Sequence, residues 1–211
     1  MIIKDRDIFV NLEILEKKFY TILMKKKDNT KVEKILNATI EIILTEGAAA
    51  VSTVKVAKIV GIAQSNVYLY FKNKNDLLLS AYQRELDQIK ATGELKTLND
   101  SDIPIKTRID NYIRSVFNYS IEHPDGLTLI EQIKMLNISD ENLYDNNTIV
   151  IDLLNEAIET GYLKDLPVNL HMATVFNVLH RHSLNIKEGF YDQNKYSYEA
   201  IAQMVLDAVK A

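Results

Sequence analysis

The chain has 211 residues, of which 47% are apolar and 26% are charged, and it contains no cysteine. These proportions are typical of a soluble protein with a packed core, and the lack of cysteine excludes a disulfide scaffold, a cysteine zinc site and a thiol nucleophile. No run of about 18 uncharged apolar residues exists, and four charges within the first seven residues are unlike a secretory signal. We therefore expect a cytoplasmic protein with no membrane association.

The net charge of −4 conceals an asymmetry along the chain. Residues 1–75 contain 13 lysines and arginines against 8 acidic residues, whereas the remainder contains 12 against 21. A basic front and an acidic rear suggest that only the front binds a polyanion. Charge alone leaves open the alternative of an ordinary solvated surface.

The chain is predicted to be all-α, because only six glycines and three prolines interrupt apolar residues that recur mostly at helical spacing. Apolar residues at steps of three and four between Ile8 and Ile22 predict an amphipathic helix over residues 1–23. Met24 then opens a basic run that leads to Thr30. Residues 1–29 are thus an N-terminal extension with a basic arm; they contain either a genuine extra helix or a segment upstream of a native start at Met24.

From Thr30 onwards the helix signals become firm. Thr30 is a good helix cap, and the apolar stripe that follows it ends at Gly47. A second helix is predicted from Ser52–Thr53 to Val60, a third from Gln64 to Phe71, and a fourth from after Lys74 to beyond Leu86.

The second and third of these helices predict a helix-turn-helix motif. Val56 and Ala57 face Ile62 and Val67 across Gly61, and small apolar residues at these positions allow the two helices to approach. Gly61 supplies the left-handed backbone that reverses the chain. In such motifs the second helix enters the major groove of DNA and its N-terminal residues contact base edges.

The predicted third helix, which is the second helix of the motif, begins with residues that can read DNA. Glutamine and asparagine can bond bidentately to adenine, and tyrosine hydroxyls and lysine ammonium groups can bind phosphates. The candidate base contacts are Gln64, Ser65 and Asn66, and the candidate phosphate contacts are Thr53, Tyr68, Tyr70, Lys72 and Lys74. The alternative is that the tyrosines merely pack the helices together.

Residues 52–77 resemble the DNA-binding signature of the tetracycline-repressor (TetR) family. The shared features are a helix begun by Thr53, the Gly61-Ile62 turn, a Tyr-x-Tyr-Phe sequence at 68–71, and a Lys-x-x-Leu sequence at 74–77. With the helix before Gly47, the resemblance covers residues 30–80. It implies phosphate contacts from Thr53, Tyr70 and Lys74, and base contacts from Gln64, Ser65, Asn66 and Tyr68. Val60 and Leu69 depart from the family pattern, and Leu69 puts a backbone contact at its position in doubt.

Further helices are predicted at 104–122, 125–137, 147–160, 168–188 and 197–209. Their spacing, with the break at 161–164, is similar to the ligand-binding and dimerisation domain of the family. The resemblance therefore implies a DNA-binding domain at 30–88 and a helical ligand-binding and dimerisation domain at 89–211. It also implies a homodimer, formed by the last two helices, whose recognition helices lie roughly 34–36 Å apart on a palindromic operator. The candidate interface residues are Leu170, Phe176, Leu184, Ile201, Val205 and Ala208, which a buried core explains equally well.

A ligand pocket lined by Tyr112, Phe117, Met135 and Phe176 is a further expectation, although aromatic and methionine residues at helical spacing are more often plain core. The four histidines offer no metal site, because His180 and His182 point about 200° apart on a helix. No phosphate-binding loop, metalloprotease helix or serine elbow is found. We therefore expect no metal, no cofactor and no enzymatic activity.

The resemblance implies a sequence-specific transcriptional regulator, a repressor released from its operator by a small-molecule inducer. Two alternatives remain. One is an architectural or cell-division DNA-binding protein of the same fold without an inducer. The other is a metabolite-binding module or enzyme whose DNA-binding domain is vestigial.

Overall fold

The computed structural model describes residues 29–91, 97–136, 138 and 148–211. The predicted helix over 1–23 and the alternative start at Met24 lie outside these residues. The described residues form helices and no sheet, which confirms the predicted all-α class, and Leu163 and Lys210 make an isolated bridge. None of the described helices is long and apolar enough to cross a membrane.

The front of the molecule is built from short helices around a small core. Residues 29–46 form the first helix, followed by η1 (Ala48–Ala50), α2 (Thr53–Val60), α3 (Gln64–Val67) and α4 (Lys74–Ala91). Gly47 ends the first helix with a φ of 91°, and the Ser52 side chain caps α2 by accepting from the backbone N–H of Lys55 at 3.2 Å. These bounds agree with the predicted helices except in α3 and at Thr30, which was predicted as the cap of the first helix but already lies within it.

The α3 helix is shorter than the predicted span of Gln64 to Phe71. It ends at Val67, whose carbonyl accepts from the backbone N–H groups of both Tyr70 and Phe71, each at 3.0 Å. This shared acceptor tightens the chain into a turn. The turn directs the Phe71 side chain into the core, where it is almost fully buried.

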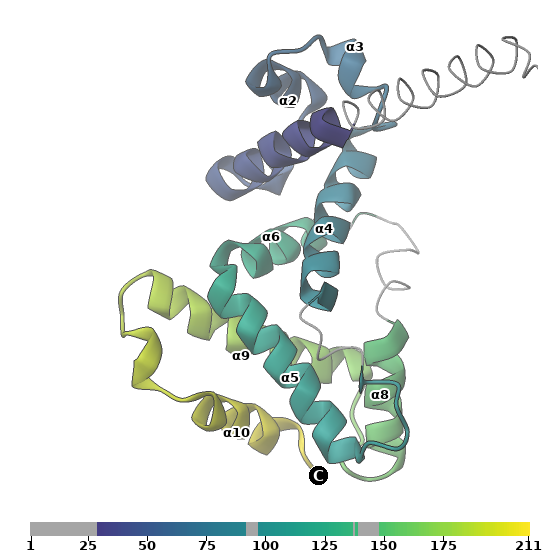
Figure 1. Ribbon diagram of the computed structural model, residues 1–211, viewed down its shortest axis with the longest axis vertical. Coiled ribbons are helices and arrows are strands. Elements are labelled where there is room, and N and C mark those ends of the chain that lie inside the picture. Colours follow the sequence, from purple (N-terminus) through teal and green to yellow (C-terminus); the bar gives the residue numbers. More distant parts are fainter. Residues whose placement is uncertain (1–28, 92–96, 137, 139–147) are drawn as a thin grey trace, which may run out of the picture.

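The rear of the molecule is a larger helical group. It contains α5 (Ile105–Glu122), α6 (Pro124–Lys134), α8 (Thr148–Glu159), α9 (Val168–Lys187), η3 (Gln193–Lys195) and α10 (Tyr198–Val209). In Figure 1, α2 and α3 lie at one end, α5, α8, α9 and α10 lie at the other, and α4 runs from the first group to the second. Leu77 and Leu78 of α4 are fully buried, and Tyr82 and Leu86 further along the same helix are also buried. Because α4 also packs against α5 and α6, it belongs to both groups.

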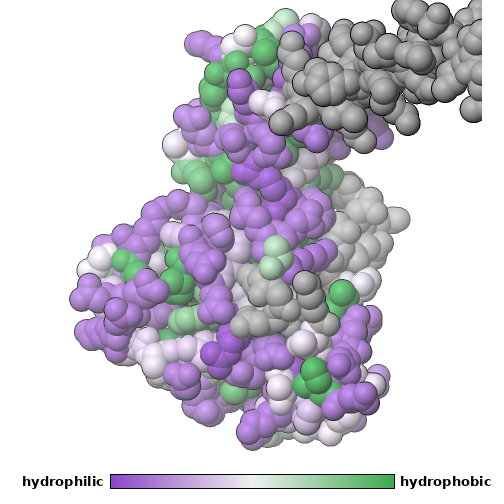
Figure 2. Space-filling model, viewed as in Figure 1, coloured by the Kyte–Doolittle hydropathy of each residue, from purple (hydrophilic) through white to green (hydrophobic). Residues whose placement is uncertain are grey.

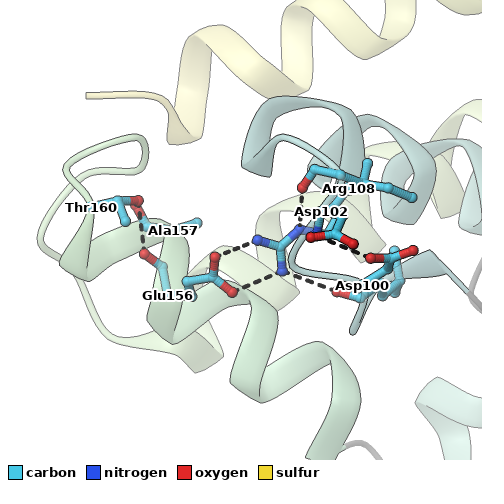
Figure 3. A network of polar contacts seen from close by, with 8 residues as sticks. Asp100, Asp102, Arg108, Glu156, Ala157 and Thr160 are labelled. Atoms are coloured by element: carbon cyan, nitrogen blue, oxygen red, sulfur yellow. Dashed lines mark hydrogen bonds and ion pairs between the residues drawn. The ribbon is translucent and has the colours of Figure 1, made fainter.

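A buried arginine fixes the start of α5 to α8. Arg108 is 4% exposed, and its guanidinium donates to the carbonyls of Ile103 (2.9 Å) and Leu98 (3.2 Å). Both Nη atoms also bond the Glu156 carboxylate of α8, and Figure 3 shows the guanidinium between that carboxylate and the turn before α5. This fork geometry suits arginine in particular, because its planar donors can satisfy a carboxylate and two carbonyls together.

A second buried polar contact joins α4, α5 and α6. The Tyr119 hydroxyl of α5 donates to the carboxylate of Glu85 on α4, and both side chains are buried. Gly126 of α6 lies against the hydroxyl end of the Tyr119 side chain, so that a β-carbon at this position would lie 2.7 Å from Cζ and would overlap the hydroxyl. Glycine is therefore required here for the close approach of the ring.

Candidate nucleic-acid interface and ligand cavity

The helix-turn-helix packs across its turn as the sequence predicts. Gly61 adopts the left-handed conformation (φ 73°, ψ 37°), and the backbone N–H of Ile62 donates to the carbonyl of Ala57 at 3.0 Å. Val56, Ala57 and Val67 are at most 3% exposed. The turn therefore holds α2 and α3 at a fixed angle with little space between them.

The N-terminal end of α3 faces solvent. Gln64 and Ser65 are exposed, Asn66 is half-buried, and Tyr68 just beyond the helix is 51% exposed. All four predicted base contacts thus lie on one short stretch. The side chain of Leu69 is 75% exposed, so this departure from the family pattern puts an apolar group on the surface.

A cluster of three polar side chains joins the start of α2 to α3. The Gln64 amide Nε2 donates to Thr53 Oγ1 at 2.9 Å and to the Tyr68 hydroxyl at 3.4 Å, and the two hydroxyls are 3.2 Å apart. These contacts orient the Gln64 side chain before any DNA is bound. They also place Thr53, a predicted phosphate contact, inside the protein, where it is only 6% exposed.

The predicted phosphate contacts after α3 have different surroundings. Tyr70 is half-buried against the core, Lys72 is exposed, and the Lys74 ammonium donates to the Ala49 carbonyl at 2.7 Å. At the start of α4, Asn73 Oδ1 accepts from the backbone N–H of Asp76 (2.9 Å), and the Asp76 carboxylate accepts from that of Lys72 (2.7 Å). These two hydrogen bonds cap the N-terminus of α4 and fix the backbone that carries Lys72 and Lys74.

The rear group contains a cavity of about 440 Å³, partly open to solvent, between α4, α5, α6, α8 and α9. Its volume lies within the usual range for small-molecule sites, and its walls are mostly apolar. The lining residues are Tyr82, Leu86, Ile89, Lys90, Tyr112, Val116, Leu127, Ile130, Glu131, Lys134, Met135, Val150, Ile151, Asn169, Met172, Ala173, Phe176 and Asn177.

Three of the four predicted pocket residues, Tyr112, Met135 and Phe176, line this cavity, and Phe117 does not. The Phe117 ring instead stacks on His182 at 5.6 Å and meets Tyr198 edge-on at 5.2 Å. The reason is helical geometry: Val116 lines the cavity, and the next residue is turned about 100° away from it.

One acidic side chain of the cavity wall is engaged by a histidine. Glu131 Oε2 lies 3.2 Å from His180 Nδ1, and His180 Nε2 lies 2.8 Å from the Thr128 hydroxyl. Burial lowers the pKa of His180, against the opposing effect of Glu131. The neutral ring then donates from Nδ1 to Glu131 and accepts from Thr128 at Nε2.

Sequence reasoning did not identify the contact that joins α6 to the front group. The backbone N–H of Ala48 in η1 donates to Gln132 Oε1 at 3.0 Å, and the neighbouring residues Glu131, Lys134 and Met135 line the cavity. Because Lys74 of α4 bonds Ala49, η1 is attached to both α4 and α6, only three residues before α2 begins. No local pattern marks a glutamine for a partner 84 residues away.

The predicted dimer residues are divided between surface and interior. Leu170 is 51% exposed on α9, and Ala208 is exposed on α10. Val205, in contrast, is fully buried within the chain, and it therefore belongs to the core. Phe176 lines the cavity.

Comparison with known proteins agrees with this architecture. The family model of bacterial regulatory proteins, tetR family, matches residues 35–81. A crystal structure from Lactobacillus plantarum, assigned as a transcription regulator, is 52% identical; the match covers 85% of this chain and 98% of that chain, with a TM-score of 0.79. A TetR family transcription regulator from Marinobacter aquaeolei VT8 has the same fold, with a TM-score of 0.73 at 21% identity over 88% of this chain and 98% of that chain.

The chain is also similar in sequence to a regulator of fatty acid metabolism. The fatty acid metabolism regulator protein of Bacillus subtilis (strain 168) is 25% identical over 193 residues, which are 86% of this chain and 95% of that protein. The family match spans the first helix, α2, α3 and the start of α4, and the 52% identical relative aligns with nearly its whole length. The chain therefore belongs to the TetR family and is a DNA-binding transcriptional regulator.

Proposed function

We propose that the protein is a homodimeric repressor that binds a palindromic operator and is released by a small organic ligand in the rear cavity. Residues 30–88 form the DNA-binding domain in this proposal, and residues 89–211 form the ligand-binding and dimerisation domain. The observation that carries it is that α6 both lines the cavity and bonds η1 through Gln132. Since operator DNA is chromosomal, the proposal includes a cytoplasmic location.

The DNA contacts follow from the exposed end of α3 and the turn after it. Gln64, Ser65, Asn66 and Tyr68 are assigned to base edges, because their side chains lie at the helix end that enters the major groove in this motif. Lys74, Tyr70 and Thr53 are assigned to phosphates. For Thr53 this requires its hydroxyl to exchange one of its two internal partners for a phosphate oxygen.

Dimerisation is assigned to α9 and α10. Leu170 on α9 and Met204 on α10 are large apolar side chains that expose 51% and 54% of their surface. A symmetric pairing would cover them in both subunits. It would also hold two copies of α3 at the spacing of successive major grooves, roughly 34–36 Å.

Ligand binding releases the operator if the ligand favours a different spacing of the two α3 helices. A tenfold loss of operator affinity corresponds to about 1.4 kcal/mol of coupling between the two sites. The similarity to a fatty acid metabolism regulator makes compounds of fatty acid chemistry the first ligands to test.

Asn66→Ala and Lys74→Ala are expected to weaken DNA binding in different ways. Loss of a base contact should cost about 1–3 kcal/mol on the operator and little on shuffled DNA. Loss of a phosphate contact should weaken binding to both DNAs and reduce the salt dependence by about one counterion. Fluorescence anisotropy with the upstream intergenic DNA and a shuffled duplex, at two salt concentrations, measures both effects.

Equal losses on the two DNAs for both variants would contradict this division of roles. Equal weak binding of the native protein to both DNAs would instead favour an architectural role. Thermal denaturation of each variant shows whether the fold is intact, which matters for Lys74 because its ammonium bonds Ala49.

Gln132→Leu is expected to uncouple the cavity from DNA. The substitution leaves an uncharged side chain that is one bond shorter and has no acceptor for the Ala48 N–H, so movement of α6 is no longer transmitted to η1. We expect ligand affinity within about threefold of native and at least a fivefold smaller effect of ligand on operator affinity, a loss of about 1 kcal/mol of coupling. Gln203→Leu, at an exposed glutamine of α10, is the matched control. Undiminished release by the Gln132 variant would show that this contact is not part of the route.

A further inference from the structure

We propose that the cavity binds an amphipathic organic anion, with an unbranched apolar chain along its length and a carboxylate-type head group paired with Lys134. This inference rests on the proposed assignment of the cavity as a ligand site. It adds the chemical class of the ligand and the residue that recognises the charge.

The lining residues form long stripes on three helices. On α4 they run from Tyr82 to Lys90, on α6 and its C-cap from Leu127 to Met135, and on α9 from Asn169 to Asn177. Each stretch covers eight helical steps, which is about 12 Å at 1.5 Å per residue. The lining positions recur every three or four residues, so each helix presents one continuous stripe to the cavity. Each stripe is long enough to contact an extended apolar chain over about 12 Å of its length.

The walls favour an apolar chain. Aliphatic side chains from four helices, among them Leu86, Val116, Ile130 and Val150, surround the space. Each methylene transferred from water into such surroundings contributes about 0.8 kcal/mol. Affinity should therefore rise with chain length until the cavity is filled and then stop rising.

The charged residues of the lining favour an anionic head group. They are Lys90, Lys134 and Glu131, and the carboxylate of Glu131 is already bonded to His180. Within the described ranges, no acidic side chain forms an ion pair with either lysine. Two ammonium groups against one engaged carboxylate leave the lining with a net positive charge, which opposes a cationic ligand.

Lys134 is assigned to the head group because it is the lysine drawn toward the cavity wall. Its ammonium lies 5.7 Å from the centroid of the Phe176 ring, which is itself a lining residue. Desolvation lowers the pKa of Lys134, although the residue as a whole is exposed. A carboxylate can therefore reach its ammonium from the cavity and form a charge-assisted hydrogen bond, which is stronger than a neutral one.

Calorimetric titration of the full-length protein in the absence of DNA tests the ligand class. The probes are saturated fatty acids from octanoate to hexadecanoate, the matching primary alcohols, and an acyl-coenzyme A, which carries its negative charge on phosphates. We expect dodecanoate to bind at least tenfold more tightly than dodecan-1-ol. A stronger acyl-coenzyme A signal would identify a phosphate-bearing source of the same anionic chemistry. Alcohols that bind as tightly as acids, or no binding by any chain compound, would overturn the inference.

Matched variants test the residue and the cavity. Lys134→Met should reduce the advantage of acid over alcohol to within about threefold, whereas Lys90→Met should retain it. Loss of the advantage in Lys90→Met alone would overturn the assignment of Lys134. Ala173→Phe, which fills the cavity from α9, should abolish binding of acid and alcohol alike, and unchanged binding would place the ligand elsewhere. Thermal denaturation shows that each variant is folded.

A second experiment tests the proposed function separately: each probe is added to the complex of the protein with operator DNA, and release of the DNA is measured. Acids that bind without releasing DNA would refute release by ligand but leave the ligand class standing. Release of DNA by an uncharged compound that binds the same cavity would support release by ligand and would refute the anionic ligand class.

Discussion

Replacement of Arg108 by methionine should lower the free energy of unfolding by about 2–3 kcal/mol, because it removes a buried guanidinium that satisfies two backbone carbonyls and pairs with the half-exposed Glu156. Methionine fills similar space, but the carbonyls of Leu98 and Ile103 lose their donor and Glu156 loses its partner. Urea denaturation followed by circular dichroism measures the change. Native and variant proteins must be compared at one protein concentration, since unfolding of a dimer depends on it.

Lys55→Met is the control, because it removes an ion pair without removing a buried side chain. Lys55 bonds Glu46 at 2.6 Å on the surface, where both side chains are about half exposed. Exposed pairs contribute at most about 1 kcal/mol. If the Arg108 variant loses no more stability than this control, the buried network does not stabilise the fold.

The same pair predicts a dependence of stability on pH. The hydrogen bonds from Arg108 lower the pKa of Glu156 from its ordinary value of 4.5. A carboxyl group whose pKa is lower in the folded state stabilises that state above the unfolded pKa, and this contribution is lost as the pH falls through the folded pKa. Glu156→Gln should therefore be less stable than the native protein near neutral pH, and the difference should shrink below about pH 4.5.

Gly126→Ala should cost about 3 kcal/mol, although alanine is normally the better helix former. The new methyl group would lie 2.7 Å from Cζ of Tyr119 and overlap its hydroxyl, so the ring must move. Its movement breaks the hydrogen bond to Glu85 and leaves a buried carboxylate without that donor. Urea denaturation measures the loss, and an unchanged midpoint would mean that the ring can move at no cost.

A double-mutant cycle separates the steric from the polar effect. Tyr119→Phe alone removes the hydrogen bond to Glu85 and should cost about 1–3 kcal/mol. Combined with Gly126→Ala, it also removes the hydroxyl that the methyl group would overlap. The double variant should therefore be more stable than the sum of the single losses implies. Strict additivity would show that the two residues do not act on each other.

The order of the helices and the helix-turn-helix were predictable from sequence, because both depend on neighbours within a few residues. Ser52 caps α2 through Lys55, Gly61 turns the chain through Ala57, and the apolar spacing around Val56 and Val67 specifies the packed faces. Such contacts are local, so their residue types carry the information. The end of α3 was predicted wrongly because the shared acceptor at Val67 depends on where Phe71 packs.

Tertiary structure alone decided which apolar residues line a cavity and which fill the core. Helical periodicity marks Val116 and Phe117 equally as buried, yet only Val116 reaches the cavity, because the packing of five helices determines where space remains. The enclosure of the Thr53 hydroxyl and the contact between Gln132 and Ala48 likewise depend on distant elements meeting. The sequence by itself therefore determined the class of protein and the helix-turn-helix that carries the predicted DNA contacts. The folded chain determined the lining and charge of the rear cavity and its connection to η1, because both arise between helices that are remote in sequence.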